Sequence, residues 1–327
     1  MKTNKKFRDR MFFFVLIFIQ LIIIQSLSAQ KFVIPILPDT QVEVNVAPEM
    51  FMSQMHWIAD KKDSLNFPFV LHVGDFVDFN NPDHYKRASD GFSILDKAKI
   101  PYAITLGNHD TEAVGENSGS AAPGNVNQNL RKTVKFNTYF PVKRFRDQKG
   151  RFEKNKSDNA YYTFKAGGLK WLVVALEFCS RQEPVTWAGK IIAKYPDHNV
   201  IILTHYFLDA NGMIGQDNAG YGDMSPQKIY DQVIKQYPNV CLVISGHTGS
   251  TAHRDDTGVK GNHIYELLQD YQGENKGGGF IRLLEIDPDK GTMSAKMYSP
   301  YTKVTKTDAS QFSFSNVEFV GAKPKNQ

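Results

Sequence analysis

Cysteine is scarce in this chain, with only two residues in 327. Two cysteines are too few for the disulfide framework that holds together many small secreted domains. Cys179 follows one apolar run and Cys241 begins another, so parallel neighbouring strands would hold the two sulfur atoms at opposite ends of a sheet. We therefore expect two unpaired thiols.

A long apolar run is also missing, because the longest one extends only from Met11 to Ile24 and Gln20 interrupts it. A membrane-spanning helix needs roughly 20 such residues. The run follows a basic stretch and precedes the small and polar residues 26–29, an order typical of a secretory signal peptide. We expect residues 1–29 to be removed and the protein to be secreted or periplasmic, meeting the membrane only during export. An uncleaved N-terminal anchor is the alternative.

A large net charge is absent once this leader is set aside. The whole chain carries +5, and residues 1–29 hold five basic and one acidic side chains, so the rest of the chain carries only +1. Nucleic-acid-binding proteins usually present a strongly basic surface, so no nucleic-acid partner is expected. With no internal repeat or block of like charge, residues 30–327 are predicted to form a single domain.

The sequence does contain a regular succession of short apolar runs and amphipathic segments. The runs are rich in β-branched residues and are predicted to be buried strands, at residues 32–37, 69–73, 102–106, 172–176, 200–203 and 240–244. Segments with helical spacing lie between them, at residues 48–61, 82–98, 182–194 and 226–236. This alternation predicts an α/β layered fold.

The later part of the chain has a different character. Residues 161–165 alternate between polar and apolar, and residues 280–286 and 293–298 are predicted antiparallel strands that flank a turn at residues 287–291. We expect them to form a second, more antiparallel sheet packed on the first. Residues 111–128 are rich in Gly, Ser, Asn and Ala, and are predicted to be a long loop of the kind that often shapes a site.

Five of the predicted strands are followed at once by side chains that can bind metals. They are Asp39, Asp75, Asn108 with His109, His205 and His247. The carboxyl ends of the strands in an open α/β sheet share one edge, so we expect these positions to converge. Each alone has a common structural explanation, such as a helix cap or a packed imidazole. Together, carboxylate, amide and imidazole donors suit divalent transition metals and predict a metal site.

These segments resemble the calcineurin-like metallophosphoesterase superfamily, whose motifs are D-x-H, G-D-x-x-D, G-N-H-D/E, a lone His and G-H-x-H. The order is the same here, and residues 74–78 and 107–110 fit their motifs completely. The resemblance implies an α/β fold, a four-layer α-β-β-α sandwich of two mixed sheets flanked by helices. It also implies two divalent metal ions at one edge, with Mn, Fe, Zn and Mg all open as their identity.

The resemblance further implies a role for each residue. Asp75 would bridge the metals, Asp39 would serve one of them, and Asn108, His205 and His247 would complete the other. Gln41 could still bind the metal of Asp39 through its amide oxygen. His109 would be the catalytic acid that acts on the leaving group. Two cations about 3.5–4 Å apart can share a hydroxide and stabilise both the entering and leaving oxygens. The implied activity is hydrolysis of a small phosphate mono- or diester outside the cytoplasm.

Two more carboxylates are expected to support these residues. Asp78 is expected to orient a ligand or loop, although a helix cap is the alternative. Asp110 is a candidate to hold the ring of His109. Arg254 and Arg282 are candidate phosphate clamps, because a guanidinium group fits phosphate with two hydrogen bonds.

Two departures from the motifs fall on the same metal, since Gln41 and Gly249 stand where the superfamily has His. An amide oxygen is a harder donor that favours Mn²⁺ or Mg²⁺, and Gly249 offers no side-chain ligand. Glu177, at the end of a predicted strand, is the first candidate substitute and His253 the second. Pairing of Glu177 with an Arg or Lys is the alternative. Residues 38–41, with the Asp-Thr-Gln sequence, together with residues 176–178 and 270–272 resemble an exported branch of the superfamily, which suggests that the variation is built in.

The same departures keep a rival function open. A metal-dependent binding protein or pseudoenzyme would recognise a phosphorylated or glycan ligand without turnover. A DNA-directed nuclease is a third hypothesis, which the nearly neutral charge of the chain after the leader does not favour. The sequence indicates no oligomeric state.

Overall fold

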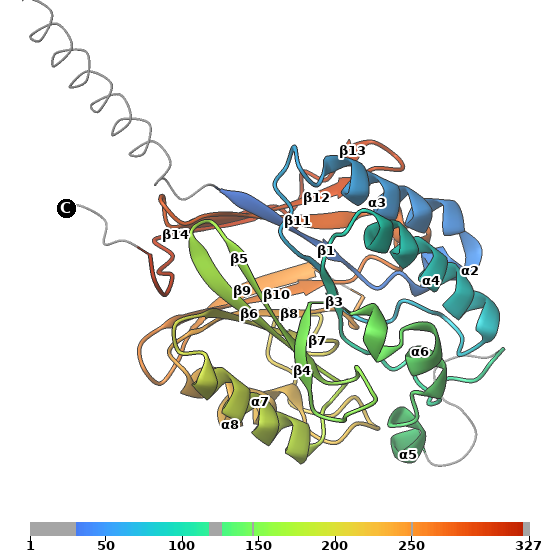
Figure 1. The fold of residues 1–327 in the computed structure, drawn as a ribbon, viewed down its shortest axis with the longest axis horizontal. Coiled ribbons are helices and arrows are strands. Elements are labelled where there is room, and N and C mark those ends of the chain that lie inside the picture. Colours follow the sequence, from blue (N-terminus) through green and yellow to red (C-terminus); the bar gives the residue numbers. More distant parts are fainter. Residues whose placement is uncertain (1–30, 118–125, 146, 250, 323–327) are drawn as a thin grey trace, which may run out of the picture.

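The computed structural model describes residues 31–117, 126–145, 147–249 and 251–322 (Figure 1). The expected signal peptide at residues 1–29 lies outside these ranges, as does the middle of the predicted loop, residues 118–125. Of the helices that are described, none has both the length and the apolar character needed to cross a bilayer.

The first sheet is mixed and has the strand order β13-β12-β11-β1-β2-β3, with β14 also pairing with β12. Its parallel part consists of β1 (Phe32–Leu37), β2 (Val70–His72) and β3 (Tyr102–Ile104). Its antiparallel part consists of β11 (Ile281–Asp287), β12 (Thr292–Ser299), β13 (Val304–Thr305) and β14 (Phe312–Ser315). The predicted hairpin is therefore present, but it extends the sheet of β1.

The second sheet is also mixed, with the order β4-β5-β6-β7-β8-β10-β9. The central parallel strands are β6 (Leu169–Leu176), β7 (Asn199–Thr204), β8 (Val240–Ser245) and β10 (His263–Gln269). Antiparallel strands lie at the margins: β4 (Gln148–Arg151), β5 (Ala160–Ala166) and β9 (Thr251–Thr257). The later strands therefore do not form a separate antiparallel sheet, because the hairpin of β11 and β12 lies in the first sheet and β5 lies in the second.

Helices cover the outer face of each sheet and complete four layers (Figure 1). The first sheet carries α2 (Gln41–Val46), α3 (Pro48–Lys61) and α4 (Pro82–Lys97). The second carries α7 (Gln182–Lys194) and α8 (Pro226–Gln232), and a 3₁₀ turn, η2 (Ile234–Gln236), completes the helix that was predicted over residues 226–236. Short segments fill the connections: α5 (Val126–Leu130), α6 (Val134–Tyr139), η1 (Val142–Arg144) and η3 (Asn275–Gly277).

Local chemistry explains where α4 begins. The side chain of Asn81 accepts a hydrogen bond from the backbone N–H of His84, and Pro82 occupies the first helical turn. An Asn cap satisfies an N–H group that has no partner within the helix, and proline has no N–H to satisfy there. The helix therefore starts just after β2 and the motif that follows it.

The main hydrophobic core lies between the two sheets. The ring of Phe32 on β1 meets Trp171 on β6 edge to face at 5.6 Å, and Phe69 stacks on Phe164 at 5.0 Å. A second core packs the outer face of the second sheet against α7 and α8. The central strands are therefore buried on both faces, which is why they read as continuous apolar runs.

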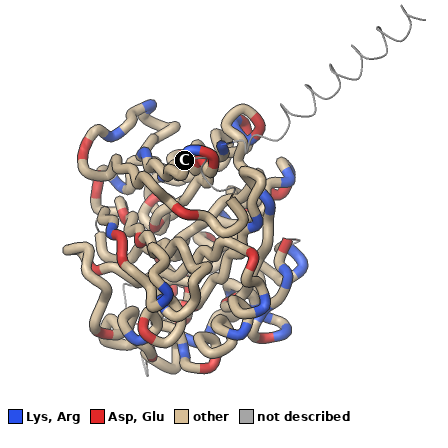
Figure 2. The backbone as a smooth tube through the Cα atoms, turned by 90° about the vertical axis from the view of Figure 1, so that its left-hand side faces the viewer, with Lys and Arg blue, Asp and Glu red and all other residues tan. Residues whose placement is uncertain are grey.

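The ends of five strands meet at the junction of the two sheets. His205, after β7, hydrogen-bonds through its ring to the carbonyl oxygen of Val73, after β2, at 2.8 Å. The backbone N–H of His247, after β8, donates to the carboxylate of Asp39, after β1, at 3.0 Å. The expected convergence is present, but the residues come from two sheets and not from the edge of one. Figure 2 shows basic and acidic residues mixed along the backbone, without a block of one sign.

Candidate metal centre

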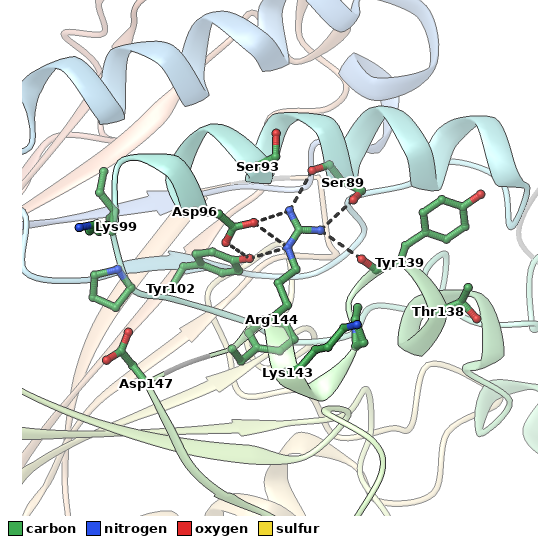
Figure 3. A pocket seen from close by; sticks show the side chains of 14 residues that line it. Ser89, Ser93, Asp96, Lys99, Tyr102, Thr138, Tyr139, Lys143, Arg144 and Asp147 are labelled. Carbon is green, nitrogen blue, oxygen red and sulfur yellow. Dashed lines mark hydrogen bonds and ion pairs between the residues drawn. The ribbon is translucent and has the colours of Figure 1, made fainter.

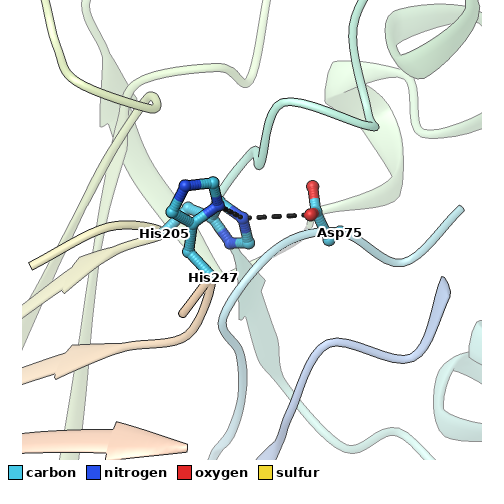
Figure 4. Close-up of side chains that lie close together, drawn as sticks. All are labelled: Asp75, His205 and His247. Carbon is cyan, nitrogen blue, oxygen red and sulfur yellow. Dashed lines mark hydrogen bonds and ion pairs between the residues drawn. The ribbon is translucent and has the colours of Figure 1, made fainter. Parts of the chain in front are cut away.

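Three side chains form a compact cluster at this junction (Figure 4). One ligand atom from each of Asp75, His205 and His247 lies within 4.8 Å of the others, and no other group of three such side chains was found among the described residues. Nε2 of His205 lies 3.1 Å from Oδ2 of Asp75 and 3.2 Å from Nδ1 of His247. Three electron-pair donors thus face one another, an arrangement that a bound cation or a shared proton would relieve.

The His205 ring is held in one orientation. Its Nδ1–H donates to the carbonyl of Val73, so Nε2 is the nitrogen that faces Asp75. Burial acts to lower the pKa of His205, but the charge and hydrogen bond of Asp75, together with the hydrogen bond to Val73, raise this pKa above its usual value. A second hydrogen bond that fixes the tautomer and aims the other nitrogen is typical of histidines that bind metals.

Three further buried oxygen atoms, on residues that follow the ends of β1 and β3, have no hydrogen-bond partner. They are Oδ1 of Asp39, Oε1 of Gln41 and Oδ1 of Asn108, and all three side chains are buried. Leaving a buried polar atom unpaired costs about 1–3 kcal/mol. All three belong to residues that the sequence pattern predicted as metal ligands. The donor set therefore fits divalent cations, which would satisfy these atoms.

The motif glycines make room for the carboxylates. A Cβ atom at Gly107 would lie 2.0 Å from Oδ1 of Asp75, and one at Gly246 would lie 2.0 Å from Oδ1 of Asp39. Asp75 and His247 themselves have positive φ values of 50° and 80°. Such a backbone costs a residue other than glycine about 1–2 kcal/mol. The two turns are thus shaped for the functional side chains at some cost in stability.

Asp110 anchors these turns through the backbone. One of its carboxylate oxygens accepts from the N–H groups of Asp75 at 2.7 Å and Gly107 at 2.8 Å. The other accepts from Phe76 at 3.0 Å and Val77 at 3.3 Å. Asp110 therefore fixes the ends of β2 and β3 together and does not hold the ring of His109, which corrects that expectation.

The His109 ring is oriented by Asp78 instead. Nδ1 of His109 lies 2.6 Å from the carbonyl oxygen of Asp78 and 3.7 Å from its carboxylate. Asn45 donates to the other oxygen of that carboxylate at 2.6 Å, and the His109 side chain is 13% exposed. Since Nδ1 must carry the hydrogen in this bond, Nε2 is the ring nitrogen left for another partner.

Glu177 is engaged elsewhere. Its carboxylate accepts from Arg181 at 2.7 and 3.0 Å and from Asn159 at 3.0 Å, and Arg131 lies 3.7 Å away. Burial acts to raise the pKa of Glu177, but the two guanidinium groups outweigh burial and lower this pKa. This is the paired carboxylate of the alternative interpretation, so the structure does not support Glu177 as the substitute ligand. The second candidate, His253, stacks on Phe312 at 3.9 Å.

Neither candidate phosphate clamp has a free guanidinium group. Arg254 bonds both carboxylate oxygens of Asp256 at 2.7 and 2.8 Å. Arg282 is fully buried and donates to the side chains of Thr251 at 2.7 Å and Tyr271 at 3.2 Å. Arg282 thereby ties β11 of the first sheet to the second sheet, and the structure supports neither arginine as a phosphate clamp.

Two features of the centre were missed from the sequence. Aromatic rings surround the imidazoles, since Phe178 lies 5.1 Å from His247 and Tyr221 stacks on Phe178 at 5.5 Å. Asp270 is 2% exposed, and its Oδ2 accepts from the backbone N–H of Gly249 at 2.7 Å. Asp270 follows a strand just as the expected ligands do, but β10 contains Glu266 and Gln269 and did not read as an apolar run.

A separate cavity of about 790 Å³ lies between α4 and the segment after α6 (Figure 3). Arg144 occupies its centre and is already bonded to Asp96 at 2.9 Å, to Ser89 at 2.8 Å and to the carbonyl of Tyr139 at 3.1 Å. None of the predicted site residues lines this cavity. The strand-end cluster is therefore the stronger candidate for a functional site.

Comparison with known sequences identifies relatives of the chain. Residues 39–250 match a family model described as calcineurin-like phosphoesterase. The chain is also 31% identical over 280 residues to the uncharacterized protein YvnB of Bacillus subtilis (strain 168). That match covers 81% of this chain but 20% of YvnB, so the chain spans about a fifth of the relative's length.

Solved structures share the fold. The purple acid phosphatase PPD1 from yellow lupin (Lupinus luteus) is 13% identical, with a TM-score of 0.55 over 88% of this chain and 54% of that one. A dimetal phosphatase from Danio rerio is 12% identical, with a TM-score of 0.52 over 88% and 99%. GAP50, the anchor in the inner membrane complex of Plasmodium, is 10% identical, with a TM-score of 0.53 over 90% and 91%. The expected four-layer α/β sandwich of two mixed sheets is confirmed.

Proposed function

This chain belongs to the calcineurin-like phosphoesterase family, and we propose that it hydrolyses small phosphate mono- or diesters with two divalent cations bound at the strand-end centre. One observation carries the proposal. Asp39, Gln41 and Asn108 follow the ends of β1 and β3 and carry buried, unpaired oxygens, and with the cluster of Asp75, His205 and His247 they would form a mixed oxygen and nitrogen donor set.

The residues divide into two groups around Asp75. Asn108, His205 and His247 would hold one cation, and Asp39 and Gln41 would hold the other, with Asp75 shared between them. Bound divalent cations polarise a phosphoryl oxygen and lower the pKa of coordinated water. Asp110 would keep the distance between the two groups constant, because it bonds the backbone on both sides of Asp75.

His109 would deliver a proton to the leaving oxygen. The bond from Nδ1 to the carbonyl of Asp78 fixes the ring and leaves Nε2 to carry and release that proton. The backbone N–H of His109 also donates to Oδ1 of Asp75 at 2.9 Å, which holds the acid beside the shared carboxylate. A positioned general acid typically contributes about 10²–10⁴-fold to a rate.

The proposal includes a location outside the cytoplasm, supported by the signal-peptide pattern of residues 1–29. Expression of the full chain followed by N-terminal sequencing of the exported product tests this part. We expect a mature N-terminus near residue 30. A membrane-bound product whose N-terminal sequence still starts at residue 1 or 2 would favour the uncleaved N-terminal anchor.

The catalytic part is tested with p-nitrophenyl phosphate and its bis-ester, assayed with Mn²⁺, Mg²⁺, Zn²⁺ or Fe²⁺. We expect metal-dependent hydrolysis of at least one ester, and His109→Ala should lower kcat by about 10²–10⁴-fold with the bound metal retained. His263→Ala is the matched control, because this half-exposed imidazole pairs with Asp255 on the second sheet. Inactivity of the wild-type protein on both esters and on common nucleotides with every metal would refute the proposal.

A second candidate function is binding without turnover. Gln41 and Gly249 favour it, since the chain lacks two imidazoles of the family pattern. A single tightly bound metal, with no hydrolysis when more metal is supplied, would support the binding protein over the enzyme.

A further inference from the structure

We propose that Asp270 is a ligand of the second cation and replaces the imidazole that Gly249 cannot supply. This inference rests on the proposed function, because it assumes a cation held by Asp39 and Gln41. It assigns the missing ligand to a strand-end carboxylate that lies outside the family motifs, beyond the matched residues 39–250.

The sheet register brings Asp270 to the centre. Strand β10 runs parallel to β8, and Leu268 is paired with Ser245. Asp270 directly follows the end of β10, and His247 follows the end of β8 by two residues. Asp270 therefore stands just past the end of the strand beside the one that leads to His247.

The loop that carries Gly249 in place of the family's histidine also holds the side chain of Asp270. Its Oδ2 accepts from the N–H of Gly249 at 2.7 Å, and its Oδ1 accepts from the N–H of Gln272 at 3.1 Å. Gly249 has a φ of 66°, and a Cβ atom there would meet no described atom within 4 Å. The loop therefore turns its N–H towards Asp270 and leaves the space beside it free of side chains.

Asp270 is one of three buried carboxylates at the centre that have no Lys or Arg partner among the described residues. Asp39, Asp75 and Asp270 are each at most 2% exposed. Among the described residues, no Lys or Arg forms an ion pair with any of them. Buried carboxylates are ordinarily paired or bound to metals. The buried, unpartnered oxygens of Asp39 and Gln41 independently indicate that a ligand is missing at this point.

The resulting second site consists of oxygen donors alone. Asp39, Asp75 and Asp270 would supply carboxylates and Gln41 an amide oxygen, whereas the first site includes two imidazoles. Oxygen donors suit Mn²⁺ and Mg²⁺, and nitrogen donors also suit Zn²⁺. The second site should therefore prefer Mn²⁺ over Zn²⁺.

The decisive measurement is metal binding by the whole protein. The chelator-treated protein is titrated with Mn²⁺ by calorimetry, bound metal is counted by elemental analysis, and electron paramagnetic resonance reports whether two Mn²⁺ ions are coupled. We expect two coupled ions in the wild type. Asp270→Asn keeps an acceptor for Gly249 but loses the charge, so it should weaken the second site at least tenfold and leave the spectrum of an isolated ion.

The matched control is Asp158→Asn. Asp158 is 2% exposed like Asp270, but its oxygens accept from Thr133 at 2.6 Å and Asn137 at 2.8 Å, away from the cluster. The control should bind two coupled Mn²⁺ ions. Unchanged binding of both ions by Asp270→Asn would overturn the assignment, and so would a wild-type protein that binds only one.

A second variant reports direct ligation in case Asp270→Asn folds poorly. In Asp270→Cys a thiolate would select a soft cation, so Cd²⁺ should bind and give a thiolate-to-cadmium absorption band in the near ultraviolet. The wild type, whose two cysteines are buried, should show no such band. Absence of the band in a folded Asp270→Cys protein would contradict ligation.

These results separate the inference from the proposed function. If the wild type binds two Mn²⁺ ions, Asp270→Asn loses one and no ester is hydrolysed, the ligand assignment stands and the hydrolase proposal fails. If esters are hydrolysed and Asp270→Asn keeps both ions, the hydrolase stands and the assignment fails.

Discussion

The carboxylate of Asp110 accepts hydrogen bonds from four backbone N–H groups, which belong to two turns of the centre. In Asp110→Asn one oxygen becomes an NH₂ group that cannot accept these bonds. We expect the free energy of unfolding to fall by about 2–3 kcal/mol, the cost of leaving buried donors unpaired. Urea unfolding measures the change.

The control for Asp110→Asn is Asp231→Asn, which removes an exposed pair with Lys235 on the surface of the second sheet's helices. Such surface pairs contribute about 0–1 kcal/mol. Equal destabilisation by the two substitutions would show that the four backbone hydrogen bonds do not matter.

The two thiols should be inert in the folded protein. Cys179 and Cys241 are unpaired and buried, and burial raises the pKa of each to about 12. Because the thiolate is the reactive form, we expect no reaction with Ellman's reagent until urea unfolds the chain, when two thiols per chain should react. Rapid labelling of the native protein would contradict the buried positions, and no labelling after unfolding without a reductant would indicate a disulfide.

Helix α2 carries a buried carboxyl group that makes stability depend on pH. Oε1 of Glu43 accepts from Gly279 at 3.0 Å and Gln54 at 3.3 Å, and burial raises the pKa of Glu43 from 4.5 to about 8. Between these values the folded chain keeps a proton that the unfolded chain has lost, so stability falls as pH rises through this range. Glu43→Gln should remove this loss.

We therefore expect the Tm of Glu43→Gln, relative to the wild type, to be higher at pH 8.5 than at pH 5. Differential scanning calorimetry at the two pH values measures this difference. Glu49→Gln, an exposed substitution in the first turn of α3, is the control and should show no such trend. A Tm difference between Glu43→Gln and the wild type that stays constant with pH would refute the explanation.

Elements with a strong local pattern could be predicted from the sequence. Helices α3 and α7 have the predicted bounds, and the strands with continuous apolar runs lie within a few residues of their predicted positions. Strand β10 was missed because Glu266 and Gln269 break its apolar run although both are buried. A buried polar side chain depends on its surroundings in the fold, and the sequence of one segment does not contain them.

The site was predictable to the same extent as its elements. The residues expected as ligands follow recognisable strands within short motifs, and the structure brings Asp75, His205 and His247 into one cluster with Asp39 beside it. Asp270 follows the strand that was missed, and the partners of Glu177 lie on other segments. The distribution of strands between two mixed sheets could not be derived locally either, because β1 pairs with β11 from the far end of the chain.

At the scale of the molecule, bound metal should join the two sheets. Asp39, Asp75 and Asn108 come from the first sheet, and His205 and His247 come from the second. A ligand at about 100 times its dissociation constant stabilises the folded state by roughly 2.7 kcal/mol. We expect Mn²⁺ to raise the Tm of chelator-treated protein, and His247→Ala to lose much of this gain.

Differential scanning calorimetry with and without Mn²⁺ measures both effects. His198→Ala is a suitable control, because His198 lies at the opposite end of the second sheet, beside Asp197 before β7. A Tm that is the same with and without metal would contradict a site shared by the two sheets.

The pairing of β1 with β11 also has a consequence for how the protein is made. Strand β1 acquires one of its two neighbours only when residues 281–287 have been synthesised. Until then one edge of β1 is bare, and a bare edge can recruit strands from other copies. Incompletely synthesised chains should therefore be prone to aggregation and should need a chaperone. A variant that lacks residues 278–327 should aggregate and should not fold into an active fragment.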